Sequence, residues 1–418
     1  MKRHFAIFSI LVFVSFCLMA CSVVPFQPAL TSSAKLYNSQ YVLQFSETKN
    51  NERYYGEKNR LLWLYDLCII SHYAKNHKAS NQTCQQAEGL VENLQKISIS
   101  ESVQVYFSDS NARSYSGYPF EKHFLHAIGM INYSTSGNTA EALIESRRLD
   151  ISTNSINKKD ISLEESFGRY LSALIYESEG NMDSALIDYR KAFHGYLENN
   201  KKLGLPYPSM IGNDLQRAFL KMDSENQYEL YKNKYFLPEP VYPLDKGRGE
   251  VILIIEAGLA PYRATEFFSN TSSEQPFGIF KDRFPLIHHA VAKVVDGQQS
   301  EKSTKVYDTR LVLKDFEQQK IRAEIDSNNF DFIADHNFSH FGGSMGTYEP
   351  VADNERADVR SWFTLPGAVH FLRMSLLQGK HDLAVKYYSY YNEEIYRQLL
   401  EDVVVRANKR TFLFVKLP

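Results

Sequence analysis

The spacing of hydrophobic residues divides the chain into a helical half and a later half that is rich in strands. From about Tyr54 to Tyr235, hydrophobic positions recur every three or four residues, a period typical of amphipathic helices. Two such stripes, Leu61 to Tyr73 and Cys84 to Leu94, lie on either side of a polar turn around His77 to Asn81. The pattern predicts a helical hairpin in this part of the chain.

An internal repeat follows in the helical half. Six residues keep the offsets at which the tetratricopeptide pattern places its small residues, its aromatic residues and its turn: Ala173, Tyr176, Gly180, Ala185, Tyr189 and Ala192. A weaker copy lies upstream: Met130, Tyr133, Gly137, Ala142 and Ser146. Small residues at these positions would let the two helices of one unit approach closely. The copies are 43 residues apart, so we expect an inserted loop over Ile151 to Asp160. A generic helical bundle with alanines at its contacts is the alternative.

After two more expected helices, over Met210–Lys221 and Glu225–Tyr235, three prolines between Leu237 and Leu244 end the helical half. Glu250 to Glu256 is then a continuous hydrophobic run with charged ends, which predicts a buried strand. Further expected elements are strands over 278–280, 286–289, 305–313 and 382–391, a hairpin loop over 296–303, a helix over 315–329, a helix within 360–377, and a terminal hairpin of 402–406 and 411–416. Helical offsets at Ala384 and Tyr388 compete with the strand over 382–391.

These elements predict an α+β fold with a tetratricopeptide-like helical repeat domain over 51–237 and a β-rich domain over 249–418. The β-rich domain would contain one or two helices and the C-terminal hairpin. Proline and glycine composition places the border between Pro238 and Gly249. We expect residues 51–237 to fold alone, and residues 358–418 to need 249–335 to complete their sheet. Trp362 would lie at the start of the C-terminal helix, packed against the strand from Val251 to Ile255.

The first 20 residues have the layout of a secretory signal: a basic start, a hydrophobic segment and small residues at the cleavage point. The triplet Leu18-Met19-Ala20 directly before Cys21 looks like the lipobox of bacterial lipoproteins. The Cys21 thiol would then carry diacylglycerol, and residues 21–50, rich in Ser, Thr, Gln and Pro, would form a flexible tether. An ordinary signal peptide with a chance cysteine is the alternative.

Charge, hydrophobicity and cysteine content limit the possible partners and the membrane topology of the chain. The net charge of −2 becomes −4 when Lys2 and Arg3 leave with the signal, which argues against a nucleic-acid-binding protein. No later hydrophobic run is long enough for a second membrane span. In an oxidising compartment, Cys68 and Cys84 could form a disulfide or remain two buried thiols that act as small hydrophobic residues.

Three groups of residues are candidate chemical sites. Gly342-Gly343-Ser344-Met345-Gly346 matches the G-x-S-x-G pattern, but no helix is predicted directly after it, which disfavours a nucleophilic Ser344. Asp335, His336, His340 and the pair His288-His289 could bind a metal, but the surrounding Asn and Gly residues disfavour a metal-binding helix. The cluster of Tyr387, Tyr388, Tyr390 and Tyr391 could stack on sugar rings or serve as an ordinary amphipathic filler.

Several motifs resemble those of a family of uncharacterised bacterial lipoproteins. They are Tyr118-x-x-Glu121, Arg147-Arg148, Gly249-Glu250-Val251, Glu256-x-Gly258-Leu259-Ala260-Pro261, Ala357-Asp358-x-Arg360-Ser361-Trp362-Phe363-x-Leu365-Pro366 and Lys409-Arg410-Thr411-Phe412-Leu413. The resemblance covers most of the mature chain, and the Arg-Ser-Trp stretch is its most specific part. It implies an envelope lipoprotein with a helical repeat region and a β-rich end, and it implies no reaction.

Together these features predict a lipid-anchored scaffold that binds other envelope proteins through its helical repeats, without a cofactor and without nucleic acid. Ser22 follows the acylated cysteine, and outer-membrane lipoproteins lack an Asp at that position, so we expect the periplasmic side of the outer membrane. The alternatives are an enzyme that acts on cell-wall or polysaccharide material and a glycan-binding protein.

Overall fold

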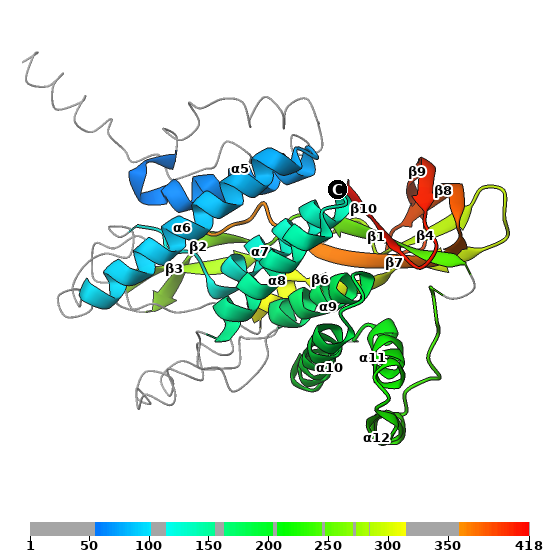
Figure 1. Ribbon diagram of the computed structural model, residues 1–418. Helices are drawn as coiled ribbons and strands as arrows, with labels where there is room; N and C mark the ends of the chain where they lie inside the picture. Colours follow the sequence, from blue (N-terminus) through cyan, green and yellow to red (C-terminus); the bar gives the residue numbers. More distant parts are fainter. Residues whose placement is uncertain are drawn as a thin grey trace, which may run out of the picture.

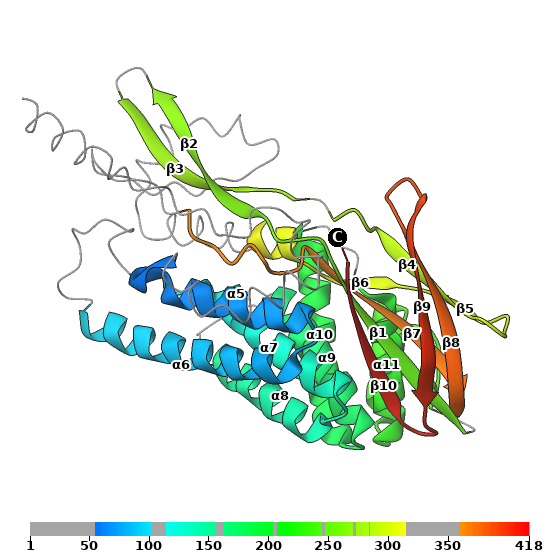
Figure 2. The same cartoon turned by 90° about the horizontal axis from the view of Figure 1, so that it is seen from above.

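The computed structural model describes residues 55–101, 114–154, 163–203, 207–244, 247–270, 273–283, 285–314 and 359–417. These residues form three layers, seen in Figures 1 and 2: an array of helices, a four-stranded sheet packed on it, and a second four-stranded sheet on the far side of the first. The fold is therefore mixed α+β, with helices in the N-terminal part and sheets in the C-terminal part, as the sequence predicts.

The helical layer consists of hairpins. Its helices are α5 (Arg60–Tyr73), α6 (His77–Glu101), α7 (Pro119–Thr135), α8 (Thr139–Asn154), α9 (Leu163–Ser178), α10 (Met182–Leu203), α11 (Ser209–Lys221) and α12 (Glu225–Tyr235). The first hairpin, α5–α6, carries a disulfide between Cys68 and Cys84. The expected inserted loop begins later than the pattern suggests, because α8 continues to Asn154; residues 155–162 lie outside the described part.

Small residues allow these helices to pack closely. Ala173, Ala185 and Ala192 are fully buried between α9 and α10, and Gly180, with a φ of +77°, forms the turn that joins the two helices. Gly129, Gly168 and Gly212 stand at contacts between elements, where an added Cβ would lie 2.8, 2.5 and 2.9 Å from neighbouring side chains. The order of small and aromatic residues thus positions each helix against the next.

The first sheet has the strand order β10-β1-β7-β6 and is covered on both faces. It contains β1 (Arg248–Ala257), β6 (Thr304–Asp308), β7 (Ala368–Leu377) and β10 (Arg410–Leu417), with β1 and β10 parallel. The second sheet has the order β5-β4-β8-β9 and contains β4 (His289–Val294), β5 (Ser300–Lys302), β8 (Gly379–Tyr388) and β9 (Glu394–Val405). A separate hairpin of β2 (Tyr262–Asn270) and β3 (Ser273–Lys281) extends away from the layers (Figure 2).

Alternation along β1 divides the interior into two hydrophobic cores. Ile252 and Ile254 belong to the core shared with the helices, whereas Val251, Leu253 and Ile255 belong to the core between the two sheets. The helix-side core is continuous from α5 through α12 to Phe412 and Phe414 of β10. The helical and β-rich parts therefore adjoin in sequence near the expected border, but they share one core.

Several sequence-based expectations about the C-terminal part are wrong. Residues 368–377 form β7 instead of a helix, because both faces of this strand are buried and its hydrophobic run shows no alternation. The C-terminal hairpin does not form as a strand pair, because β9 pairs with β8 while β10 pairs with β1. The expected helix over 315–329 lies outside the described residues, and residues 309–314 are helical where a strand was expected.

Trp362 also packs differently from the expectation. Its ring stacks on Tyr65 of α5 with 4.3 Å between ring centroids, and its backbone N–H donates to the Glu121 carboxylate of α7 at 2.7 Å. Tyr118 and Glu121 form a capping box at the start of α7. The segment before β7 is therefore fixed to the helical layer. Within the described residues, no helix is both long enough and hydrophobic enough to cross a membrane.

His370 makes the stability of this fold sensitive to acid. Its imidazole is fully buried on β7, and burial, assisted by Lys305, lowers its pKa to about 3; His288 and His289 act in the same direction and Asp308 opposes them. The unfolded chain takes up a proton at this residue below about pH 6.5, while the folded chain remains neutral. Stability contributed by neutral His370 is therefore present above pH 6.5 and lost as the pH falls towards 3.

We expect His370→Leu to remove this part of the pH dependence. At pH 5 the wild type should have lost about 2 kcal/mol through His370 relative to neutral pH. Urea unfolding of both proteins at pH 7.5 and pH 5.0 measures the difference between the two slopes. Equal losses in wild type and variant would show that His370 is protonated, or exposed, in the folded protein.

Candidate binding cleft

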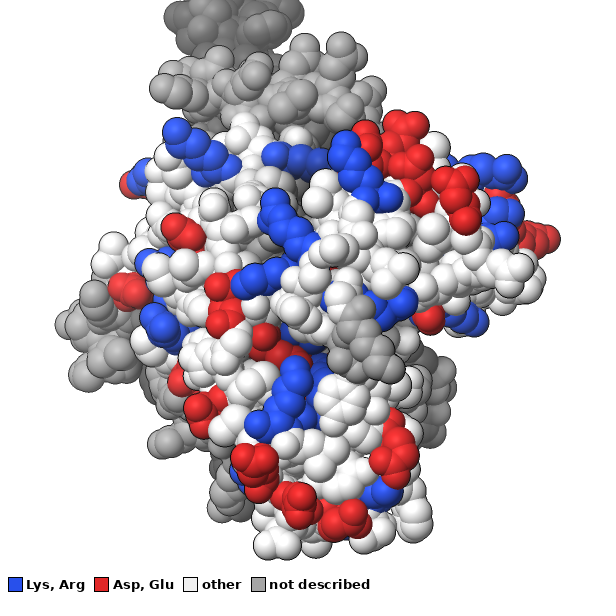
Figure 3. All heavy atoms as spheres, turned by 45° about the vertical axis from the view of Figure 1, so that its right-hand side comes forward, with Lys and Arg blue, Asp and Glu red and all other residues white. Residues whose placement is uncertain are grey.

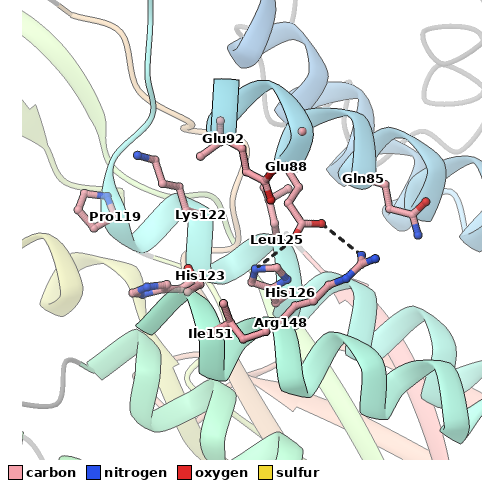
Figure 4. Close-up of a pocket in the computed structure, with 13 residues that line it drawn as sticks. Gln85, Glu88, Glu92, Pro119, Lys122, His123, Leu125, His126, Arg148 and Ile151 are labelled. Atoms are coloured by element: carbon pink, nitrogen blue, oxygen red, sulfur yellow. Dashed lines mark hydrogen bonds and ion pairs between the residues drawn. The ribbon is translucent and has the colours of Figure 1, made fainter. Parts of the chain in front are cut away.

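A cleft of about 750 Å³ opens between α6, α7 and α8. Figure 4 shows its side chains: Glu88 and Glu92 come from α6, Lys122, His123 and His126 from the first half of α7, and Arg148 from the second half of α8. Val91 and Leu125 form its buried hydrophobic part, and Ile151 at its rim is 69% exposed. The cleft therefore combines charged walls with a small hydrophobic surface.

Three of these polar groups form a network with Glu145 of α8. His126 contacts Glu145 through Nδ1 at 3.1 Å, and its Nε2 lies 3.9 Å from the Glu88 carboxylate. The Arg148 guanidinium donates to Glu88 at 3.2 Å and to Glu145 at 3.0 Å. Gly129 makes room for this arrangement, since a Cβ there would lie 2.8 Å from Cγ of Glu145. The network joins α6 to the α7–α8 hairpin and fixes the width of the cleft.

Partial burial changes the acid–base properties of two groups in the cleft. Burial raises the pKa of the Glu88 carboxyl, against the opposing effect of His126 and Arg148. Burial also lowers the pKa of the Lys122 ammonium, with Glu121 opposing the change. Both groups are thus partly removed from water, and charges in such a place interact more strongly with a ligand than charges on an open surface.

A second and larger charged network lies between the helices and the first sheet. The Glu177 carboxylate of α9 accepts two hydrogen bonds from Arg217 of α11, at 2.9 and 2.7 Å, and one from Arg410 of β10, at 3.1 Å. Arg410 also donates to Glu250 of β1 at 2.7 Å. Arg373 of β7 donates to the same carboxylate at 2.7 Å.

Asp214 completes this network by accepting hydrogen bonds from the Tyr170 hydroxyl, at 2.7 Å, and from Arg373, and by pairing with Arg217 at 2.8 Å. Three carboxylates and three guanidiniums, all on side chains that are less than 10% exposed, thus balance in charge, and the more exposed Lys221 ammonium adds a contact to Glu177 at 3.1 Å. Burial alone would raise the pKa of Glu177, but Arg410 and Arg217 hold it well below its usual range. With every charge paired, this network holds the layers together and offers no free group for chemistry.

Among the described residues, none that the sequence singled out for chemistry lines the cleft. Cys21, Asp335, His336, His340 and Ser344 fall outside the described residues. His288 and His289 are adjacent, and no group of three or more His, Cys, Asp or Glu side chains with metal-binding geometry exists within the described part.

The four C-terminal tyrosines do not form one surface. Tyr387 is buried, Tyr388 stacks on His289 with 5.0 Å between ring centroids, and Tyr390 and Tyr391 are 52% and 87% exposed. The six residues of the repeat pattern, from Ala173 to Ala192, belong to the α9–α10 hairpin, and none of them lines the cleft.

Sequence reasoning missed the cleft residues because they come from three helices. Glu88 and Arg148 are 60 residues apart and meet only after the helices pack. Each is one charged residue on an amphipathic helix, a pattern shared by every exposed helix face. On the face seen in Figure 3, basic and acidic side chains are mixed, and neither sign dominates. Charge alone therefore does not point to a site.

Comparisons with known proteins do not assign the chain to a family. No family model matches the chain, and no curated protein matches it. Among solved structures, the crystal structure of BtubC (BKLC) from P. vanneervenii is similar over 52% of this chain and 79% of its own chain, with 11% identity and a TM-score of 0.32. A similarity at this level supports no conclusion about fold or function. The lipoprotein family suggested by the sequence motifs stays a prediction.

Proposed function

We propose that this protein is a lipid-anchored scaffold of the bacterial envelope that holds a segment of another protein in the cleft between α6, α7 and α8. The helical hairpins are tetratricopeptide-like units in this proposal, and the Cys21 acyl chains attach the protein to the periplasmic side of the outer membrane. The observation that carries it is the cleft itself, about 750 Å³ in volume, with hydrophobic and charged walls.

The place of binding differs from the groove that a helical repeat array usually offers. The first helix of each hairpin faces the protein's own sheet: Phe124 of α7 and Phe167 of α9 contact Tyr307, and Tyr170 contacts Phe371. Tyr73 of α5 donates to the Thr364 carbonyl at 2.8 Å. This face is therefore already covered, so we assign the partner to the cleft between α6, α7 and α8.

Site-specific photo-crosslinking tests this function. A benzoylphenylalanine at Gln85, which lines the cleft, should give one defined crosslinked product in the bacterium that makes the protein. The same probe at Asp183, an exposed residue at the start of α10, is the matched control. Similar products from both positions, or none from Gln85, would exclude the cleft as the binding site.

The anchor has a separate test. Metabolic labelling with a palmitate analogue should mark the wild type and leave Cys21→Ser unlabelled, because only the Cys21 thiol follows the Leu18-Met19-Ala20 triplet. Label that persists in the variant would contradict the lipoprotein assignment and leave the cleft proposal unaffected.

A further inference from the structure

Gly89 is a glycine that the internal packing of the protein does not explain. It stands inside α6, where glycine weakens a helix relative to alanine. Gly129, Gly168 and Gly212 also stand in helices, and each lies where an added Cβ would come within 3.0 Å of a neighbouring side chain. At Gly89 an added Cβ would meet nothing within 4 Å among the residues that the structure describes. The free protein thus has room for a side chain here.

The position of Gly89 suggests a role in binding for a residue without a side chain. It lines the cleft together with Glu88 and Glu92 of the same helix. Helix axes approach most closely where the side chains at their crossing point are small. A glycine on an open cleft wall therefore suits a partner whose backbone comes close to α6 at this point.

The walls of the cleft also indicate the conformation of the partner. They are formed by α6, α7 and α8, whose internal backbone groups are already paired within the helices. An extended segment would find few backbone partners on such walls, whereas a helix brings its own hydrogen bonds. A helix laid in a groove with its hydrophobic side inwards is a common mode of recognition.

Lys122 indicates the charge of the partner. Its ammonium is partly buried in the cleft, and among the described residues no ion pair holds it. The neighbouring Arg148 is already neutralised by Glu88 and Glu145. A carboxylate on the partner would form an ion pair with Lys122. The exposed Ile151 would contact a hydrophobic residue of the partner, one or two helical turns from that carboxylate residue.

We infer that the cleft receives an amphipathic α-helix of a partner protein, which crosses α6 at Gly89 and places an Asp or Glu side chain beside Lys122. The inference rests on the proposed function and specifies its partner. The helix turns a small residue towards Gly89 and a larger hydrophobic residue towards Ile151, Val91 and Leu125.

Four variants of the full-length protein with benzoylphenylalanine at Gln85 test this inference. Gly89→Leu and Lys122→Glu should lower the yield of the crosslinked product about tenfold or more, the loss expected for residues at the centre of an interface. Gln86→Leu and Lys78→Glu, exposed residues of α6 that do not line the cleft, should leave the yield unchanged. Gly89→Ala should raise the melting temperature of the free protein, because its Cβ meets open space.

Mass spectrometry of the crosslinked peptide then gives the sequence of the partner segment, which should be helical in pattern and contain Asp or Glu. An undiminished product from Gly89→Leu and Lys122→Glu, or a segment without these features, would overturn the helix inference while the proposed function stands. A lower melting temperature in Gly89→Ala would mean that internal packing requires the glycine, and this result would also overturn the helix inference. The absence of any product from Gln85 in the unsubstituted protein would instead remove the proposed function itself.

Discussion

Replacing Glu177 by Ala is expected to lower the free energy of unfolding by about 3–5 kcal/mol, which is the cost of removing one member of a buried ion network. The carboxylate is held by Arg217, Arg410 and Lys221 and also accepts a hydrogen bond from the Tyr189 hydroxyl at 2.6 Å. Without it, Arg217 and Arg410 remain buried with an excess of positive charge. A typical domain is stable by about 5–15 kcal/mol, so the variant should unfold at a much lower urea concentration.

Glu179→Ala is the matched control for this experiment. Glu179 lies two residues further along, at the exposed turn after α9, and surface substitutions of this kind change stability by about 0.5 kcal/mol or less. Equal effects of the two substitutions would mean that the Glu177 carboxylate is solvated and the network does not form.

The helical part alone, residues 51–237, is expected not to fold into a stable monomer. Its hydrophobic face would lose the sheet that covers Phe124, Phe167 and Tyr170. Each aromatic ring left in water costs up to about 1.5–3 kcal/mol. Asp214 and Glu177 would also lose Arg373 and Arg410. We expect a fragment that aggregates or melts without a cooperative transition, in contrast to what the sequence suggested.

Circular dichroism and sedimentation of the fragment measure this directly. The fragment of residues 51–237 should show a broad thermal transition or oligomers, while the full chain shows a single sharp transition. A monomeric fragment with full helicity and a melting temperature equal to that of the full chain would mean that the sheet adds nothing to the stability of the helices.

The helices could be predicted from sequence because their signals are local. A period of three to four residues, a small residue at each crossing and Gly180 at a turn with positive φ all act within about 20 residues. The α11 and α12 helices begin and end within one residue of the positions expected from the pattern.

The C-terminal strands were harder to predict because their partners are distant in sequence. The run at 368–377 is buried on both faces, so its hydrophobicity alone fits a strand or a buried helix equally well. A turn was expected over 407–410 and forms at Ala407 and Asn408, with β10 already beginning at Arg410, but a local turn does not decide whether β10 pairs with β9 or crosses to β1. Register with β1 places Glu250 opposite Arg410, a contact across 160 residues.

The contact between the helices and the first sheet could not be predicted from sequence for a related reason. Glu177, Glu250, Arg373 and Arg410 each appear in the sequence as one charged residue beside hydrophobic neighbours. Only the packing of the layers makes them one neutral cluster. The separation of the chain at its prolines therefore marked a real change of secondary structure, but it gave no information about whether the two parts share a core.

Hydrogen exchange of the full chain at increasing urea concentrations tests most directly whether helices and sheet form one body. Amides of α9, which carries Glu177, and of β10, which carries Arg410, should lose their protection in the same transition and with the same dependence on urea. Loss of protection in β10 at a lower urea concentration, with α9 still protected, would contradict the account.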